Sequence, residues 1–161
     1  MKSLQELLKE EKKLVLPAFN ESIARQLGEL ATDMAVQKNL SVAIRVEREG
    51  QILYQISLPG TTIDNDLWLS GKARIVHHFL HSSFYISRKM IEAGTSLADK
   101  SLLDPVLYRD KGGAVPLFVK NGGLAGVLIV SGLPDHEDHD FSIEIVNEYI
   151  KRQNTNFSDK G

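Results

Sequence analysis

Leu124-Ala125-Gly126-Val127-Leu128-Ile129-Val130 is a run of small and apolar residues that decides how the rest of the chain folds. A short run of this kind, with β-branched residues and turn residues at its ends, is typical of a strand. Because successive side chains of a strand point to opposite faces, both faces of this strand must be covered. We expect helices on both faces, or a helix on one and a second subunit on the other. This two-sided burial predicts a homo-oligomer, a dimer or larger.

The segment just before this run has the pattern of a partner strand. Residues 114–120 are mostly apolar, and Asn121-Gly122-Gly123 separates them from the strand. Glycines adopt the positive φ that a tight turn requires, so the sequence predicts a β-hairpin of residues 114–120 and 124–131. Pro116 has no N–H to donate to a neighbouring strand. It is therefore predicted to lie at a sheet edge or beside a bulge.

A second hairpin is predicted from alternating apolar residues on either side of Glu49-Gly50. These residues are Val42, Ile44, Val46, Ile52, Tyr54, Ile56 and Leu58. Alternation of this kind indicates a hairpin with one buried face.

Five segments have the apolar spacing of amphipathic helices: residues 4–14, 20–34, 64–80, 83–91 and 135–151. The first could pack on the domain or on a second subunit. The predicted N-terminal caps are Asn20, Asp64 or Asn65, Ser82-Ser83, and a capping box of Asp135 and Asp138. Gly71, inside the third segment, predicts a close approach or a local break.

The predicted order is two helices, two strands, two helices, two strands and a helix. This order predicts an α+β fold with a mostly antiparallel sheet and helices on its faces. With 161 residues, of which 42% are hydrophobic, one core is expected. We expect a single domain over residues 1–152 and a flexible C-terminal tail over residues 153–161.

Composition narrows the classes of function. The 19 basic and 21 acidic side chains leave a formal charge of -2, which does not favour nucleic acid as a partner. The absence of cysteine excludes disulfides, thiolate nucleophiles and cysteine-ligated metals, and it fits a reducing compartment. No stretch approaches the roughly 20 apolar residues of a membrane span. We expect a cytoplasmic protein with no membrane partner.

The densest polar cluster lies in the third predicted helix, at residues 72–81. Helical spacing places Arg74, His78 and His81 on one face, where basic groups could hold an anion. His77 lies four residues before His81, a spacing that ligates zinc when a third ligand comes from elsewhere. A solvated helix face, or histidines at a subunit contact, would explain the same residues.

A second cluster, residues 134–140, is rich in potential metal ligands. Glu137 and His139 would complete a metal site or an acid–base pair if they faced His77 and His81. Carboxylates in the first turn of a helix are also what its free amide groups favour, so capping explains the cluster as well.

Glycines beside two predicted strand ends form the third candidate. Backbone amides at Gly112-Gly113 and at Ser131-Gly132 could receive a phosphate or a carboxylate. Ordinary turn chemistry would explain the same glycines. The spacings of a P-loop, of a dinucleotide fingerprint and of a Gly-x-Ser-x-Gly elbow are absent. Trp68 has the spacing of a core residue.

Several short motifs together carry a family resemblance over roughly residues 3 to 151. They are Asn65-Asp66-x-Trp68, Lys72-x-Arg74-Ile75-Val76, Ser82-Ser83-Phe84, Asp104-Pro105-x-x-Tyr108, Gly112-Gly113-Ala114-Val115-Pro116 and Val130-Ser131-Gly132-Leu133-Pro134-x-x-Glu137-Asp138-His139. In this combination the chain resembles uncharacterised protein family 0303, a branch of the GlcG/HbpS-like, haem-degrading-domain superfamily. The resemblance implies a profilin-like fold, assembly into dimers or larger rings, and haem as a possible cofactor.

The sequence therefore favours a small-ligand-binding or accessory protein that holds haem, through its propionates, or another small anionic ligand as a homo-oligomer. The predicted ligand-binding residues are Lys72, Arg74, His78, Gly112, Gly113, Ser131, Gly132 and His139. One alternative is a metal- or histidine-dependent enzyme using His77, His81, Glu137 or His139. Another is a structural module that binds a partner protein through the first helix. Whether the protein is an enzyme stays open, because no activated nucleophile and no complete ligand set is evident.

Overall fold

One mixed sheet organises the chain. The computed structural model describes residues 1–160, with side chains as far as residue 156. The five strands are β1 (Val15–Leu16), β2 (Ala43–Arg48), β3 (Gln51–Ser57), β4 (Ala114–Val119) and β5 (Gly123–Ser131). They lie in the order β1-β4-β5-β2-β3, and of these pairings only β1 with β4 is parallel. The predicted α+β fold with a mostly antiparallel sheet is confirmed.

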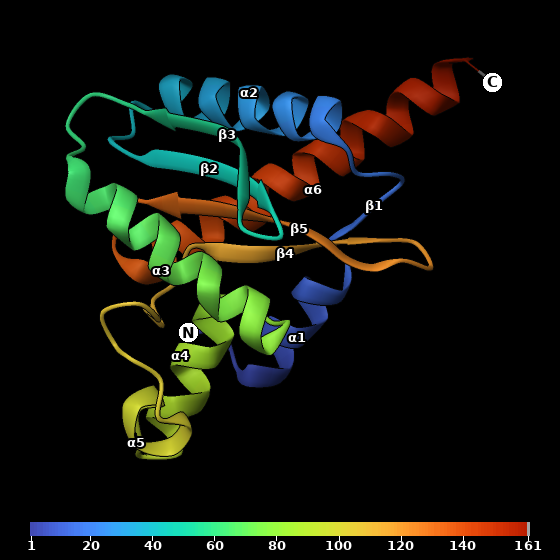
Figure 1. Cartoon of the computed structure of the whole chain (residues 1–161). Coiled ribbons are helices and arrows are strands. Elements are labelled where there is room, and N and C mark those ends of the chain that lie inside the picture. Colours follow the sequence, from blue (N-terminus) through green and yellow to red (C-terminus); the bar gives the residue numbers. More distant parts are fainter. Residues whose placement is uncertain (161) are drawn as a thin grey trace.

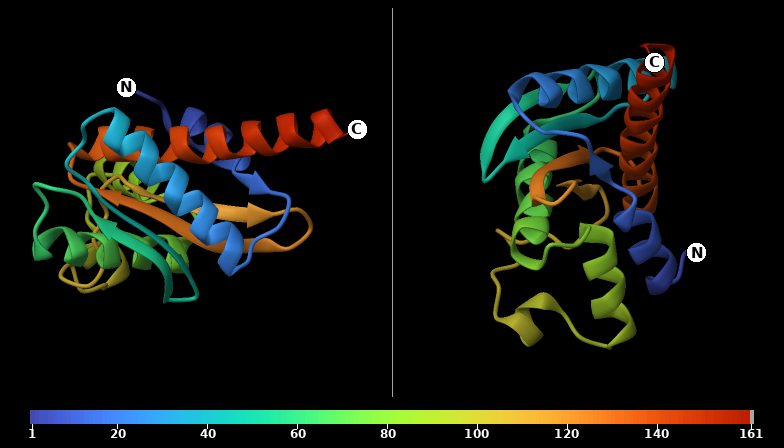
Figure 2. Two further views of the ribbon diagram at one scale, coloured as in Figure 1. Left: turned by 90° about the horizontal axis from the view of Figure 1, so that it is seen from above. Right: turned by 90° about the vertical axis from the view of Figure 1, so that its right-hand side faces the viewer.

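Helices cover both faces of the sheet (Figures 1 and 2). One face packs against α2 (Glu21–Gln37) and α6 (Asp135–Lys160), and the other packs against α3 (Ile63–Phe79). A smaller apolar cluster joins α1 (Leu4–Lys12), α4 (Ser83–Glu92) and α5 (Leu97–Ser101) beside the sheet. The sequence did not predict the short helix α5. Within residues 1–160, no helix combines the length and apolarity that crossing a bilayer requires.

Strand β5 is buried on both faces, as predicted. Leu128 and Val130 belong to the core beneath α2 and α6, whereas Val127 and Ile129 pack against α3. All four side chains are fully buried within one chain. The expectation that a second subunit covers one face of β5 is therefore not needed, because α3 covers that face.

The β4–β5 hairpin is confirmed, including its turn. Asn121 and Gly123 have φ values of 63° and 70°, the left-handed conformation expected of this turn. Pro116 lies just before a register shift between Leu117 and Phe118. Strand β1 pairs only with Phe118 and Val119, so Pro116 has no neighbouring strand on that side. The prediction for Pro116 is confirmed.

The β2–β3 hairpin forms where predicted, but its burial differs. Strand β2 lies between β5 and β3 and is buried on both faces, with Arg45 and Glu47 beneath α3. Alternation suggested one buried face, because polar residues at every second position usually face water. A register shift after Val46 also places Ile52 opposite Glu47, and Ile52 is 49% exposed. Its predicted burial is wrong.

Helix caps were predicted with partial success. Asn20 and Ser82 are the N-caps of α2 and α4, as expected. The cap of α3 is Thr62, neither Asp64 nor Asn65: its side chain accepts the Asp64 amide, and the Asn65 side chain accepts the Thr62 amide. Thr62, Asp64 and Asn65 are all residue types that can cap a helix, so composition alone does not distinguish them.

The sequence predicted that the last helix frays after Lys151. In the structure, helix α6 continues to Lys160. The polar residues there do not break a helix, and Arg152 pairs with Glu148 one turn earlier at 3.0 Å. The predicted boundary at residue 152 is therefore not a helix end. The last residue of the predicted tail, Gly161, lies outside the described residues.

Candidate functional site

An open cavity of about 450 Å³ lies where the start of α3, the end of β5 and the start of α6 meet. We name it the Lys72 pocket. Its lining combines charged, polar and aromatic side chains: Asp64, Asn65, Trp68, Lys72, Lys111, Ser131, Gly132, Leu133, Asp135 and Asp138. Three of the predicted ligand-binding residues, Lys72, Ser131 and Gly132, therefore meet in one place.

Lys72 is the most buried cation of this pocket, with a side chain that is only 3% exposed. Its ammonium group donates to the Val130 carbonyl oxygen and to Asp138 Oδ2, each at 3.0 Å. Burial lowers the pKa of Lys72, and the Asp138 charge opposes that shift. Burial also raises the pKa of Asp138, against the effect of Lys72. The two groups thus form an ion pair whose charges are poorly solvated.

Asp138 occupies one of the amides that the sequence predicted for an external anion, that of Gly132. Its carboxylate accepts the Gly132 amide at 3.2 Å and the Leu133 amide at 3.0 Å. The predicted capping box of Asp135 with Asp138 is therefore wrong, because Asp138 does not bond Asp135. The Asp138 carboxylate instead holds the β5–α6 turn through the Gly132 and Leu133 amides.

Trp68 forms a wall of the pocket and is not the core residue that its spacing suggested. The Arg109 guanidinium lies over its ring, 4.6 Å from the ring centroid. Gly71 allows this contact, since a Cβ there would lie 2.5 Å from Arg109 Cγ. The Arg109 amide also donates to the Gly71 carbonyl oxygen, so the predicted close approach at Gly71 is confirmed.

The rim of the pocket is polar. Lys111 lies two residues after Arg109. The Lys111 side chain is exposed and forms no ion pair within the described part of the chain. Asp64 and Asp135 contribute carboxylates to the same lining. Deeper in, the Asn65 side-chain amide donates to Ser131 Oγ at 3.3 Å. A ligand would thus meet an aromatic wall, charges of both signs and a hydroxyl group.

Five predicted ligand-binding residues do not line this pocket: Arg74, His78, Gly112, Gly113 and His139. Arg74 donates to the Leu107 carbonyl oxygen, and the His78 ring packs against Phe79 and Tyr108. Gly112 and Gly113 lie behind the pocket. A Cβ at Gly113 would lie 2.8 Å from Lys72 Nζ and 2.2 Å from the Val130 oxygen, so this glycine allows the lysine to reach its partners.

The candidate metal ligands are dispersed. His77 Nε2 lies 2.7 Å from Glu47, while His81 Nδ1 lies 2.6 Å from Glu11. Because α3 ends at Phe79, His81 does not share a helical face with the other basic residues, contrary to the prediction. Glu137 is exposed on α6. Among the described residues, no three or more His, Cys, Asp or Glu side chains gather in a way that could hold a metal.

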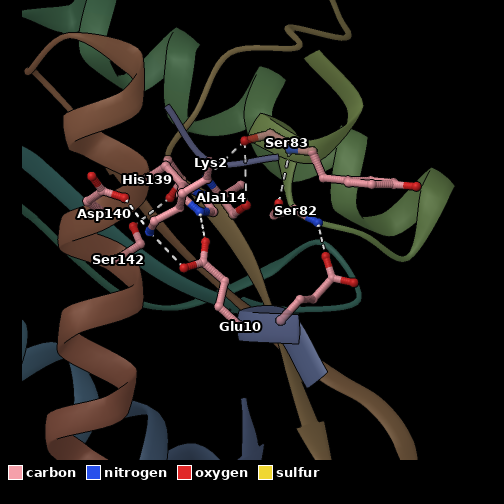
Figure 3. A network of polar contacts seen from close by, with 11 residues as sticks. Lys2, Glu10, Ser82, Ser83, Ala114, His139, Asp140 and Ser142 are labelled. Carbon is pink, nitrogen blue, oxygen red and sulfur yellow. Dashed lines mark hydrogen bonds and ion pairs between the residues drawn. The ribbon is translucent and has the colours of Figure 1, made fainter. Parts of the chain in front are cut away.

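His139 belongs to a different network, which anchors α1 (Figure 3). Its buried Nε2 hydrogen-bonds the Glu10 carboxylate, and Glu10 also accepts Lys2, which pairs with Asp140. Burial alone raises the pKa of Glu10, but hydrogen bonds from His139 and Lys2 outweigh it and hold that pKa below its usual range. The sequence missed Glu10 and Lys2 because their partners His139 and Asp140 lie 129 and 138 residues away along the chain.

A second cavity, of about 520 Å³, lies beside this network. It is lined by Met1, Lys2, Glu6, Phe84, His136 and Asp140. The Phe84 ring also packs against His139, with 5.0 Å between the ring centroids. Sequence patterns did not distinguish this cavity, because its lining comes from three separate segments.

Together these features define a class: a small α+β domain with an open, charged pocket where α3, β5 and α6 meet. A family model described as "Haem degrading protein HbpS-like" matches residues 19–147, and the chain belongs to this family. A UPF0303 protein of Streptomyces avermitilis is 36% identical over 150 residues, which cover 93% of this chain and 92% of that protein. The predicted family membership is confirmed.

Solved structures agree with the fold. The crystal structure of the Ybr137w protein superposes with a TM-score of 0.87 at 27% identity, covering 93% of this chain and 89% of that one. The crystal structure of a PduOC:heme complex has a TM-score of 0.65 at 21% identity, covering 83% of this chain and 94% of that one. The second likeness shows the shared fold.

Proposed function

We propose that the protein binds a small organic anion in the Lys72 pocket. The observation that carries this proposal is a buried lysine on the floor of an open cavity, with the Trp68 ring as one wall and the Lys111 ammonium at the rim. Binding pockets commonly combine an apolar wall with a few polar groups that orient the ligand. The Lys72 pocket has this combination.

The charges around the pocket narrow the ligand class. Lys111 is available to pair with a carboxylate, whereas Lys72 is already shared with Asp138. Asp64 and Asp135 would repel a second negative charge on the ligand. We therefore favour a ligand with one carboxylate and a small body that packs on Trp68.

Trp68 is the only tryptophan of the chain, so its fluorescence reports directly on this pocket. Titration with small carboxylic acids should change its emission in a saturable manner. Lys111→Ala should weaken the apparent affinity about two- to fivefold, the size of one exposed charge interaction. Lys120→Ala, which removes an exposed lysine at the β4–β5 turn, is the matched control. Emission that does not saturate for any acid tested would refute the proposal.

Haem is the second candidate ligand, supported by the family description and by the structural neighbour solved with haem. The Lys72 pocket does not fit haem as an iron-ligating site, since no His, Met, Cys or Tyr is among its lining residues. The second cavity fits better, because Met1 and His136 lie there beside the aromatic Phe84. His136 is the residue that would hold the iron.

Haem titration followed at the Soret band tests this candidate. A shifted band that His136→Ala removes and His78→Ala retains would support a haem site in the second cavity. A flat titration would remove haem as a ligand. Because the two cavities are lined by different residues, this result does not decide the outcome for the Lys72 pocket.

The same proposal includes self-assembly in the cytoplasm. Exposed apolar residues on the outer side of α3 support it: Ile63 is 74% exposed and Leu67 is 51% exposed. Patches of this kind are typical of subunit contacts. Sedimentation at several concentrations should detect a dimer or larger species, which Ile63→Asp with Leu67→Asp should dissociate. A monomer at every concentration would contradict the assembly.

A further inference from the structure

Lys72 borders the cavity while its amine remains paired. An ammonium group has three hydrogens to donate, and two of those of Lys72 have acceptors, Val130 O and Asp138 Oδ2. Lys72 also lines the cavity, next to Trp68 one helical turn earlier on α3. A purely structural ion pair between α3 and α6 would not need to border an open cavity.

We infer that Lys72 forms a reversible imine with the carbonyl group of a small 2-oxo acid bound in the Lys72 pocket. This inference rests on the proposed function and names its substrate class. Lys111 at the rim pairs with the carboxylate of the acid, which directs the neighbouring carbonyl carbon toward the floor. Lys72 forms this floor, and Asp138 is the group that accepts a proton from its amine.

The chemistry balances with the groups at hand. Lys72 passes one proton to Asp138 along their 3.0 Å hydrogen bond, and the neutral amine attacks the carbonyl carbon to form a C–N bond. The Asp138 proton and a second amine proton leave with the former carbonyl oxygen as one water molecule. The product is a protonated imine beside an ionised Asp138, so the positive charge that the proton transfer removed is restored.

Burial assists the first step. It lowers the pKa of Lys72 and raises the pKa of Asp138, and both changes favour transfer of the proton from the amine to the carboxylate. Lysines that react with carbonyl groups need this neutral amine, because an ammonium has no lone pair.

Reductive trapping tests the inference. The whole protein is incubated with pyruvate and sodium cyanoborohydride, and the modified lysines are mapped by peptide mass spectrometry. Lys72 should be labelled several-fold faster than Lys111, because burial lowers the pKa of the Lys72 amine and more of it is neutral. Equal or slower labelling of Lys72 would overturn the inference.

Two variants separate a reactive amine from a structural one. Lys72→Arg keeps a positive charge beside Asp138 but cannot form an imine, so labelling at residue 72 ends. Asp138→Asn keeps the amine and removes the proton acceptor, so labelling of Lys72 should slow several-fold. If Asp138→Asn leaves the labelling rate of Lys72 unchanged, Asp138 has no part in the reaction and the inference fails in that step.

Trp68 fluorescence, measured with pyruvate and with lactate, distinguishes failure of imine formation from failure of ligand binding. Lactate has the carboxylate but carries a hydroxyl group in place of the 2-oxo group. If both acids bind and pyruvate is not trapped on Lys72, the binding function stands and the imine is refuted. If neither acid changes the Trp68 emission and no label appears on Lys72, both proposals fail.

Discussion

Lys72 Nζ lies 3.0 Å from Asp138 Oδ2, although 66 residues separate them along the chain. The pair connects the middle of α3 with the first turn of α6. The Asp138 carboxylate also accepts hydrogen bonds from the amides of Gly132 and Leu133. One buried contact therefore shapes the floor of the pocket and fixes the turn that leads into α6.

Lys72→Met should destabilise the protein by about 3–5 kcal/mol, because removing one partner leaves a buried carboxylate without its counter-charge. The free energy of unfolding in urea measures the loss. Adding Asp138→Asn should recover part of it, since no charge is then left unpaired. Lys111→Met, at the exposed rim, should change stability by no more than about 0.5 kcal/mol. A Lys72→Met variant as stable as Lys111→Met would show that the buried pair contributes little.

Gly71→Ala should displace the segment that carries Arg109. The new methyl group would overlap the Arg109 side chain, which a Cβ would approach to 2.5 Å. We expect a loss of about 1–3 kcal/mol from overpacking and a shift of Trp68 emission as the guanidinium leaves the ring. Gly50→Ala is the control: it strains a turn at φ +85°, but no atom lies near its Cβ. Unchanged emission in Gly71→Ala would contradict the predicted clamp.

Acid should release α1 through Glu10. The folded-state pKa of Glu10 is held below its ordinary value of 4.5, so its contribution to stability is present above that value. The contribution is lost as the pH falls from 4.5 through the lower, folded-state pKa. Glu10→Gln should therefore be less stable than the native chain at neutral pH, and the difference should narrow in acid.

Urea unfolding at a series of pH values measures that difference. Glu144→Gln, which removes a surface ion pair with Lys38, serves as the control and should show no comparable narrowing. A Glu10→Gln difference that stays constant down to pH values well below 4.5 would show that the His139 and Lys2 contacts do not favour the charged carboxylate.

The sequence predicted the elements that local patterns determine. The two-sided burial of β5 follows from Val127 to Val130 alone, and the glycines of the β4–β5 turn reveal the hairpin. The second face of β5 is covered by α3, and local sequence patterns do not determine the path of that helix across the sheet. For that reason a second subunit and α3 were equally compatible with the same residues.

The candidate site was predicted in part for a related reason. Lys72, Ser131 and Gly132 carry polar or turn chemistry beside apolar runs, a signal visible in the sequence. The spacing of Trp68 on α3 predicts a core residue, but that spacing is the same whether the side chain faces apolar neighbours or a cavity. The contact of His139 with Glu10 spans 129 residues, and the charges of α1 resemble those of any solvated helix.

The most direct test of the Lys72 pocket follows the Trp68 indole N–H and the backbone amides of isotope-labelled protein by NMR during titration with pyruvate. We predict that the resonances of Trp68, Lys111 and Gly132 shift together and reach saturation. Shifts confined to residues around Phe84 and His136, or no shifts at all, would contradict binding in the Lys72 pocket.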